Sequence, residues 1–153
     1  ATVSELISAE AKSWIGRSGE PQRVEINRSD IIKYSIATEQ RQAKYLQGDE
    51  APPMFMFGAL RPLVPMDELG PDGISVDKFL PELPLKRVMA GGTEMKFHRT
   101  VHPGDVLRAT RSLSDMFEKQ GGTGPLIFVV YDLRVETEAG ELVMEERQTR
   151  ILR

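Results

Sequence analysis

The clearest pattern in the chain is the alternation of apolar and polar side chains over residues 126–137. A period of two is typical of a strand with one buried face, and the apolar positions are Ile127, Val129, Tyr131, Leu133 and Val135. Weaker alternation covers residues 95–101, 106–117 and 141–152, with short polar or Gly/Pro-containing turns between them. These turns predict an antiparallel meander, whose second strand is expected to bury Leu107, Ala109, Leu113 and Phe117.

The N-terminal half has helical spacing instead. Residues 2–15 carry apolar side chains at intervals of three and four, which predicts a surface helix, and residues 23–27 alternate as a short strand. A second helix is expected to begin at Asn27 or Ser29, either of which can cap it. It would bury a face made by Ile31, Ile32, Tyr34 and Ile36, and the polar residues 38–47 could extend it.

Residues 54–60 (MFMFGAL) are apolar at every position, which indicates a core segment. A buried strand and a buried helix both fit seven residues, but Met, Ala and Leu favour a helix that Pro53 would start and Pro62 would end. Free N–H groups at its start would face any bound anion or carbonyl, although a plain core helix is the simpler interpretation.

The Pro- and Gly-rich residues 64–86 are expected to form a long loop with one helical turn near residues 76–80. Such a loop either covers a site or only packs against the body. The predicted class is therefore α+β, with helices first and then a bent antiparallel sheet around one buried helix.

Composition narrows the functions open to the chain. Its 153 residues fit one domain, and 20 basic against 23 acidic residues give a net charge of −3. This balance indicates neither a nucleic-acid partner nor a membrane surface. No apolar run has the length of a membrane span, and the N-terminus lacks the order of a secretory signal, so a cytoplasmic location is expected.

Few residues are suited to metal or nucleophilic chemistry. Cysteine is absent, which excludes thiolate chemistry. His98 and His102 would lie about 13 Å apart on a strand, too far to share an ion, so we expect no metal site and an exposed structural role for His98. Residues 121–124 (GGTG) lack the lysine of a phosphate loop and predict a hairpin. The charged residues 141–153 are expected to form a solvated strand face.

Four stretches, in this order and spacing, resemble the N-terminal domain of MaoC-like dehydratases. They are residues 34–38 (YSIAT), 51–55 (APPMF), 91–99 (GGTEMKFHR) with 103–105 (PGD), and 124–129 (GPLIFV) with 140–143 (GELV). The resemblance implies a hot-dog fold, in which an antiparallel sheet wraps a helix. It also implies one domain over residues 1–153, with an N-terminal helical extension (residues 1–22) and an overhang (residues 64–88) that lines an acyl tunnel.

The same resemblance implies the reversible hydration of a 2-enoyl thioester to an (R)-3-hydroxyacyl thioester. CoA is the usual carrier, no separate cofactor is implied, and two hot-dog units pair to form each site. Active members carry an Asp and, five residues later, a His, which act as acid and base. Here Glu39 and Lys44 occupy those positions, and an ordinary lysine stays protonated at neutral pH.

The chain thus resembles the half of a two-part hydratase that has lost this dyad. A MaoC-like catalytic partner would supply Asp and His, while this half shapes the tunnel for a bulky or long acyl group. A self-sufficient homo-oligomer is the alternative, either a hydratase that uses Glu39 or a thioesterase that uses the N–H groups near residues 56–58. A non-enzymatic acyl-CoA-binding module is the third hypothesis. The candidate substrate-binding residues are Phe55, Met56, Phe57, Gly58, Arg41, Arg87, Gly91 and Gly92, and Lys44 is a further candidate cation for the CoA phosphates.

Overall fold

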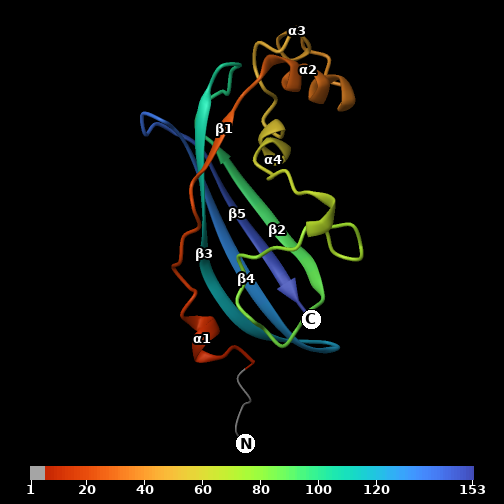
Figure 1. Ribbon diagram of the computed structural model, residues 1–153, viewed down its shortest axis with the longest axis vertical. Coiled ribbons are helices and arrows are strands. Elements are labelled where there is room, and N and C mark those ends of the chain that lie inside the picture. The colour runs from red at the N-terminus through yellow and green to blue at the C-terminus, as the bar shows by residue number, and fades with distance from the viewer. Residues whose placement is uncertain (1–5) are drawn as a thin grey trace, which may run out of the picture.

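A strongly bent antiparallel sheet of five strands forms the body of the molecule (Figure 1). The computed structural model describes residues 6–153. The sheet has the order β1-β3-β4-β5-β2, and its strands are β1 (Gln22–Glu25), β2 (Val88–Phe97), β3 (Val106–Gly121), β4 (Gly124–Thr137) and β5 (Leu142–Leu152). The predicted meander is confirmed, although β2 begins well before residue 95 and ends at Phe97. The GGTG stretch forms the β3–β4 hairpin, as expected.

The alternation over residues 126–137 places one face of β4 in the core. Ile127, Val129 and Val135 are fully buried, as this pattern predicts. On β3 the prediction holds as far as Leu113, where an irregularity between Leu113 and Asp115 shifts the register. An extra residue in one strand moves the following side chains to opposite faces. Met116 is therefore buried in place of Phe117, and Phe117 stacks on Phe128 with ring centroids 5.1 Å apart.

The second helix, α2 (Arg28–Ala37), is shorter than the sequence allows. Glu39 has a φ of 57°, and the N–H groups of Glu39 and Gln40 donate to the carbonyls of Ile36 and Ser35. These two reversed bonds form a Schellman motif, which ends a helix through a left-handed residue. The extension over residues 38–47 is thus wrong: α3 (Ala43–Leu46) is a separate turn.

The faces and caps of the N-terminal helices also differ from the expectation. Ile31 is buried, but Ile36 is 64% exposed, and Asn27 occupies the N-cap without a side-chain capping bond. Residues 2–5 of the helix predicted over residues 2–15 lie outside the described chain. In its remaining residues the helix is confined to α1 (Ala9–Lys12), which is capped by Ser8.

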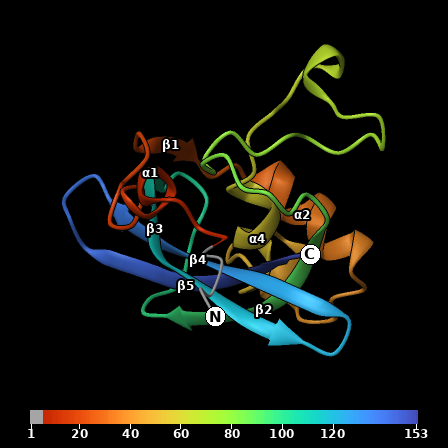
Figure 2. The ribbon, with the colours of Figure 1, turned by 90° about the horizontal axis from the view of Figure 1, so that it is seen from below.

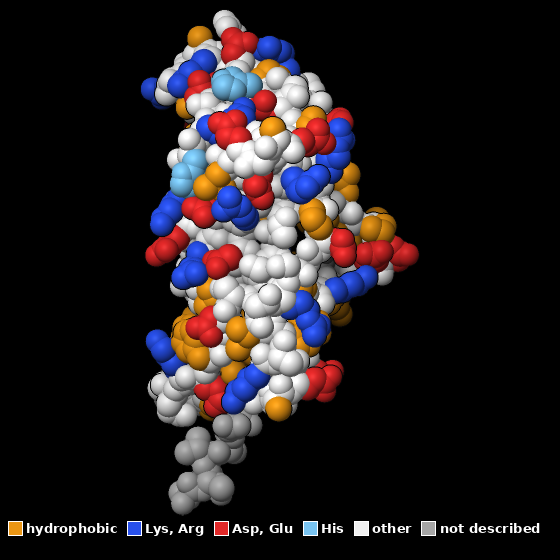
Figure 3. All heavy atoms as spheres, turned by 90° about the vertical axis from the view of Figure 1, so that its left-hand side faces the viewer, with side chains coloured by type: hydrophobic (Ala, Val, Ile, Leu, Met, Phe, Trp, Pro, Cys, Tyr) orange, Lys and Arg blue, Asp and Glu red, His pale blue; other side chains and the backbone are white. Residues whose placement is uncertain are grey.

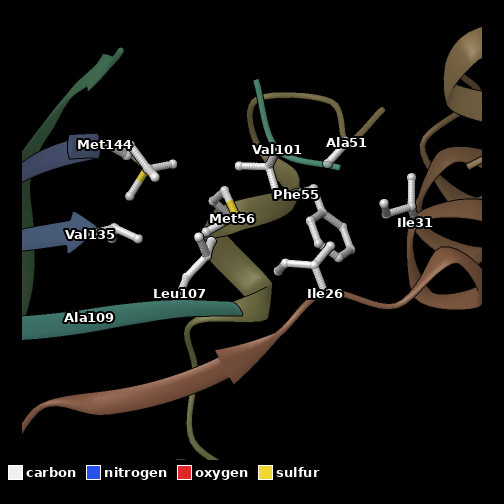
Figure 4. Close-up of a cluster of buried hydrophobic side chains, with 11 residues drawn as sticks. Ile26, Ile31, Ala51, Phe55, Met56, Val101, Leu107, Ala109, Val135 and Met144 are labelled. Atoms are coloured by element: carbon white, nitrogen blue, oxygen red, sulfur yellow. The ribbon is translucent and has the colours of Figure 1, made fainter. Parts of the chain in front are cut away.

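The apolar stretch 54–60 forms a helix, as preferred over a strand, but a short one, α4 (Phe55–Ala59). Phe55 and Met56 are both buried. Figure 4 shows Met56 facing Leu107 of β3 and Val135 of β4, whereas the ring of Phe55 lies beside Ile26 on the side of α2. Met54 is 50% exposed and Phe57 and Gly58 are also exposed, so the expectation that this segment is buried on all sides is wrong. The turn expected near residues 76–80 is absent, and η1 (Met66–Glu68) is the one helical turn described in the overhang.

Two apolar clusters cover opposite ends of the concave face of the sheet. The α4 core lies under α2 and α4 and consists of Ile26, Ile31, Ala51, Phe55, Met56, Val101, Leu107, Ala109, Val135, Val143 and Met144. The α1 core lies under α1 and the end of the overhang and consists of Ile7, Ala11, Leu83, Leu113, Met116, Ile127, Val129, Tyr131 and Leu152. Figure 2 shows the overhang as a loop that projects away from the sheet before it returns to β2.

Candidate functional site

A cluster of charged side chains lies on the concave face of the sheet. Arg111 on β3 forms a two-point ion pair with Asp77 of the overhang, with N–O distances of 3.1 and 2.7 Å. Arg150 on β5 binds the same carboxylate. We call Asp77, Arg111, Arg150 and Tyr131 the arginine cluster. It connects the overhang to two strands of the sheet.

Tyr131 on β4 is the aromatic base of the arginine cluster. The guanidinium carbons of Arg111 and Arg150 lie 3.8 and 5.2 Å from the centroid of its ring, a cation–π arrangement. Its hydroxyl donates to the carbonyl of Phe79 at 2.7 Å. Burial raises the pKa of Tyr131 to about 12, with a further contribution from the negative charge of Asp77. The phenol therefore stays protonated and acts as a hydrogen-bond donor.

Asp77 stays ionised in spite of its burial. Burial alone would raise the pKa of its carboxyl, but the hydrogen bonds and charge of Arg111, the Phe79 N–H and the charge of Arg150 together lower the pKa to about 2. Glu146 lies on the same face of β5, opposite Leu133 on β4. Burial raises the pKa of Glu146, although the charges of Arg111 and Arg61 oppose this change.

The sequence contains a signal for this cluster that the solvated-face interpretation missed. Arg111 is separated from the buried residues Leu107 and Leu113 by an even number of positions, so its side chain lies on the same face of β3. Arg150 lies opposite Val129, and residues opposite each other on neighbouring strands share a face. Charged residues at core-facing positions need partners. The expectation that residues 141–153 form one solvated face is wrong for Glu146 and Arg150.

A cavity of about 270 Å³ lies beside the start of α4 and the end of β2. It is lined by Glu50, Ala51, Pro52, Pro53, Met56, Phe97, His98, Arg99, Thr100, Val101, Val143 and Met144. At its rim the Nε2 atom of His98 lies 3.0 Å from Glu145 Oε2, and Arg99 pairs with Asp105 and Glu141 at 3.0 and 3.1 Å. His98 is exposed, as expected, and follows the end of β2 rather than lying within it.

The two positions of the degenerate dyad belong to local structure. Glu39 is exposed and forms the left-handed residue that ends α2. Lys44 on α3 lies 3.3 Å from Glu50. The hydrogen bond with Glu50 raises the pKa of Lys44, which keeps the ammonium protonated. Neither Glu39 nor Lys44 lines the cavity, although Glu50 does.

The candidates on α4 divide between core and surface. Phe55 and Met56 pack in the α4 core, and Met56 also lines the cavity. Phe57 lies on the surface with the Arg61 guanidinium 4.7 Å from its ring centroid, and Gly58 is exposed beside it. The N–H groups of Phe55 and Phe57 donate to the carbonyls of Pro52 and Met54 at 2.9 and 3.1 Å. These donors are therefore already paired.

Of the remaining candidates, Arg41 lies far from Arg87, Gly91 and Gly92, which are close together at the start of β2. Arg41 is exposed in the α2–α3 connection at one end of the molecule, whereas the start of β2 lies towards the other end (Figure 1). Arg87 pairs through its backbone with Arg153. Gly91 and Gly92 form an irregularity where β2 meets β5. A Cβ on Gly91 would lie 3.0 Å from Ile151 Cγ1 and 3.1 Å from the Thr149 carbonyl oxygen, so a side chain at this position would crowd β5.

Residues 6–153 meet neither the requirements of a metal site nor those of a membrane-spanning helix. Within them, no cluster of three or more His, Cys, Asp or Glu side chains could hold a metal ion. No helix in this part of the chain is both long and apolar enough to cross a bilayer. Figure 3 shows acidic and basic side chains intermixed over one side of the molecule, with no large area of a single charge.

Comparison with known proteins identifies the family. A model of the FAS1-like dehydratase domain region matches residues 13–146, and the chain belongs to this family. A curated relative, mesaconyl-C(4)-CoA hydratase of Chloroflexus aurantiacus, is 26% identical over 149 residues. This match includes 97% of the chain but only 52% of the relative, so the chain spans about half the length of that protein.

Solved structures share the fold at lower sequence identity. The ChsH1–ChsH2 complex of Mycobacterium tuberculosis has a chain that is 19% identical, with a TM-score of 0.68 over 94% of this chain and 86% of that one. A chain of the HadBC (3R-hydroxyacyl-ACP dehydratase) complex of the same organism is 17% identical, with a TM-score of 0.65 over 90% of this chain and 96% of that one. The MaoC-like dehydratase of Rhodospirillum rubrum is 15% identical, with a TM-score of 0.61 over 90% of this chain and 91% of that one. The expected α+β hot-dog fold of the MaoC-like type is confirmed.

Proposed function

We propose that the chain is the non-catalytic half of a two-part hydratase that acts on 2-enoyl-CoA thioesters. The observation that supports this most strongly is the state of the dyad positions. Glu39 terminates a helix, and Lys44 is held protonated by Glu50. A general base must release and accept a proton near the working pH, so Lys44 is unsuited to the role that histidine has in active members. The acid and base would therefore come from a MaoC-like partner subunit.

The exposed edge of the sheet supports pairing with a second hot-dog unit. Within the described chain, β2 pairs only with β5, and most of its residues are exposed. An open strand edge presents unpaired N–H and C=O groups to any neighbouring strand. Two of the structural relatives are complexes of different subunits, according to their names. In our proposal the catalytic partner docks along β2.

In our proposal the thioester group of the substrate lies in the cavity at the start of α4. It lies beside the end of β2, so a partner docked along this strand would cover it and complete its wall. Its lining combines apolar side chains with the polar groups of His98, Arg99 and Glu50. Binding sites for small molecules are concave and largely apolar with a few polar groups. The thioester would lie here, within reach of the partner's Asp and His.

Reconstitution tests this proposal. The isolated chain is expected to show no hydration of crotonyl-CoA or of longer 2-enoyl-CoA esters, and to gain activity with a MaoC-like partner that carries Asp and His. Turnover by the isolated chain that is lost in Glu39→Gln would instead support a self-sufficient hydratase. Release of free CoA would support a thioesterase, although the paired N–H groups at the start of α4 give that hypothesis no free donor at Phe55 or Phe57.

A further inference from the structure

We infer that Met56 and Met144 close the inner end of the cavity at the start of α4, and that this floor limits the acyl group of the substrate to about six carbons. The inference rests on the proposed function, because it takes the thioester to lie in this cavity. It deepens that proposal by naming the class of acyl group, a short aliphatic chain. The burial of the lining residues, the volume of the cavity and the residues behind its floor support it.

The lining of the cavity changes from exposed to buried side chains. Pro53 and His98 are exposed, and Phe97 on β2 is 44% exposed. At the other extreme, Met56 and Met144 are 1% and 0% exposed. A ligand that enters from solvent therefore passes the exposed residues first and ends at the two methionines.

The two methionines come from opposite sides of the cavity. Met144 lies on β5, where Phe97 of β2 is its partner in register, and Met56 lies on α4. Figure 4 shows both side chains pointing into the space between the sheet and the helix. Both belong to the α4 core, so packing within this chain holds them in place. A partner docked along β2 would cover the mouth of the cavity and leave its floor unchanged.

The volume of the cavity determines how much of an acyl group it can hold. This volume is about 270 Å³, and an apolar cavity of roughly 150 Å³ accommodates the carbons of benzene. By the same ratio the cavity holds about ten non-hydrogen atoms. The oxygen and sulfur of the thioester and the adjoining carbons of the CoA arm would occupy about four of these positions, which leaves room for about six acyl carbons.

The residues behind the floor oppose a longer chain. Leu107 and Val135, which Met56 faces, are fully buried and fill the core on that side. The next side chain of β5 on the face of Met144 is Glu146, which is partly buried. A methylene chain that passed Met144 would press against this carboxyl group, and burial of a polar group without a hydrogen-bond partner is unfavourable. The structure therefore favours a short acyl group over a long one.

Calorimetric titration with butyryl-, hexanoyl-, octanoyl- and decanoyl-CoA tests the inference. For the full chain, with its partner where one co-purifies, hexanoyl-CoA should bind about tenfold more tightly than butyryl-CoA, because the additional methylene groups are buried. Methionine is flexible and can move aside, so we expect the affinity to level off for the two longer esters. In Met144→Ala, which opens the floor, octanoyl-CoA should bind about tenfold more tightly than hexanoyl-CoA.

A second buried methionine provides the matched control. Met116 is 5% exposed and lies in the α1 core, away from the cavity. Met116→Ala should lower the melting temperature as Met144→Ala does, but the affinity should still level off at hexanoyl-CoA. Val101→Leu serves if Met144→Ala does not fold. It adds a carbon to a buried lining residue, and should reduce the advantage of hexanoyl-CoA over butyryl-CoA to about twofold.

The outcomes separate this inference from the proposed function. A wild-type affinity that rises through decanoyl-CoA would overturn the floor and leave the hydratase proposal intact. A limit that shifts equally in Met144→Ala and Met116→Ala, or an unchanged advantage of hexanoyl-CoA in Val101→Leu, would do the same. Binding of no ester, with or without the partner, would overturn the hydratase proposal together with the limit on acyl length.

Discussion

The attachment of the overhang through Asp77 gives the sharpest test of the physical reasoning. Replacement of Asp77 by Asn preserves the size of the side chain but removes its charge, which leaves Arg111 and Arg150 facing each other without a counter-ion. The pKa of Asp77 in the folded chain, about 2, lies below the ordinary aspartate value of 3.8. This difference corresponds to roughly 2.4 kcal/mol. Because the side chain is 21% exposed, solvent screening reduces the expected contribution to about 1–2 kcal/mol.

The sign of the pH dependence follows from the same values. A carboxyl whose pKa is lower in the folded state stabilises the fold fully above its unfolded pKa and loses this effect as the pH falls towards the folded pKa. The advantage of the wild type over Asp77→Asn should therefore be complete above pH 4 and should decline between about pH 4 and pH 2, the interval set by the two pKa values.

Urea denaturation at neutral and acidic pH measures this effect. Glu82→Gln is the control, because Glu82 forms an ion pair with Lys86 in the same part of the chain but is 95% exposed. The control should leave the midpoint unchanged. A midpoint for Asp77→Asn equal to that of wild type at pH 7, or a difference that persists undiminished at pH 2, would refute the reasoning.

Three further substitutions test other parts of the structure. Glu39→Gly should raise the free energy of unfolding by about 1 kcal/mol in chemical denaturation, because glycine adopts the left-handed conformation at the end of α2 without strain; a loss of stability would contradict the Schellman motif. Tyr131→Phe should lower that free energy by about 1–2 kcal/mol and speed proteolysis of the overhang, because the Phe79 carbonyl loses its donor; unchanged stability and cleavage would count against this bond. Gly91→Ala should lower the melting temperature, because its Cβ would crowd β5, whereas Gly122→Ala in open space should not; equal effects would be inconsistent with close approach at Gly91.

The sequence predicted the buried positions best where alternate side chains of a strand keep to one face throughout. The alternation in β4 correctly identified its buried face, and the all-apolar stretch correctly placed Phe55 and Met56 in the core. The prediction of buried positions from alternation failed beyond Leu113 in β3, because the irregularity there exchanges the two faces of the strand. A register shift of this kind arises from pairing with β4, which is a non-local property.

The charged residues show a different limit. Arg111 and Arg150 alternate with buried apolar side chains, which indicated that they face the core. The carboxylate that makes their burial favourable comes from a loop more than thirty residues away in sequence. No local pattern marks Asp77 as that partner. The helical end at Glu39 was also missed, because glutamate is an unusual residue for a left-handed position.

The central claim is that this chain shapes a hydratase site without moving protons itself. The most direct measurement is the hydration rate of crotonyl-CoA for the isolated chain, for a MaoC-like partner with Asp and His, and for the two together. We expect turnover to require the partner, to rise when the chain is added, and to be unaffected by Glu39→Gln. Turnover by the chain alone that disappears in Glu39→Gln would contradict the claim.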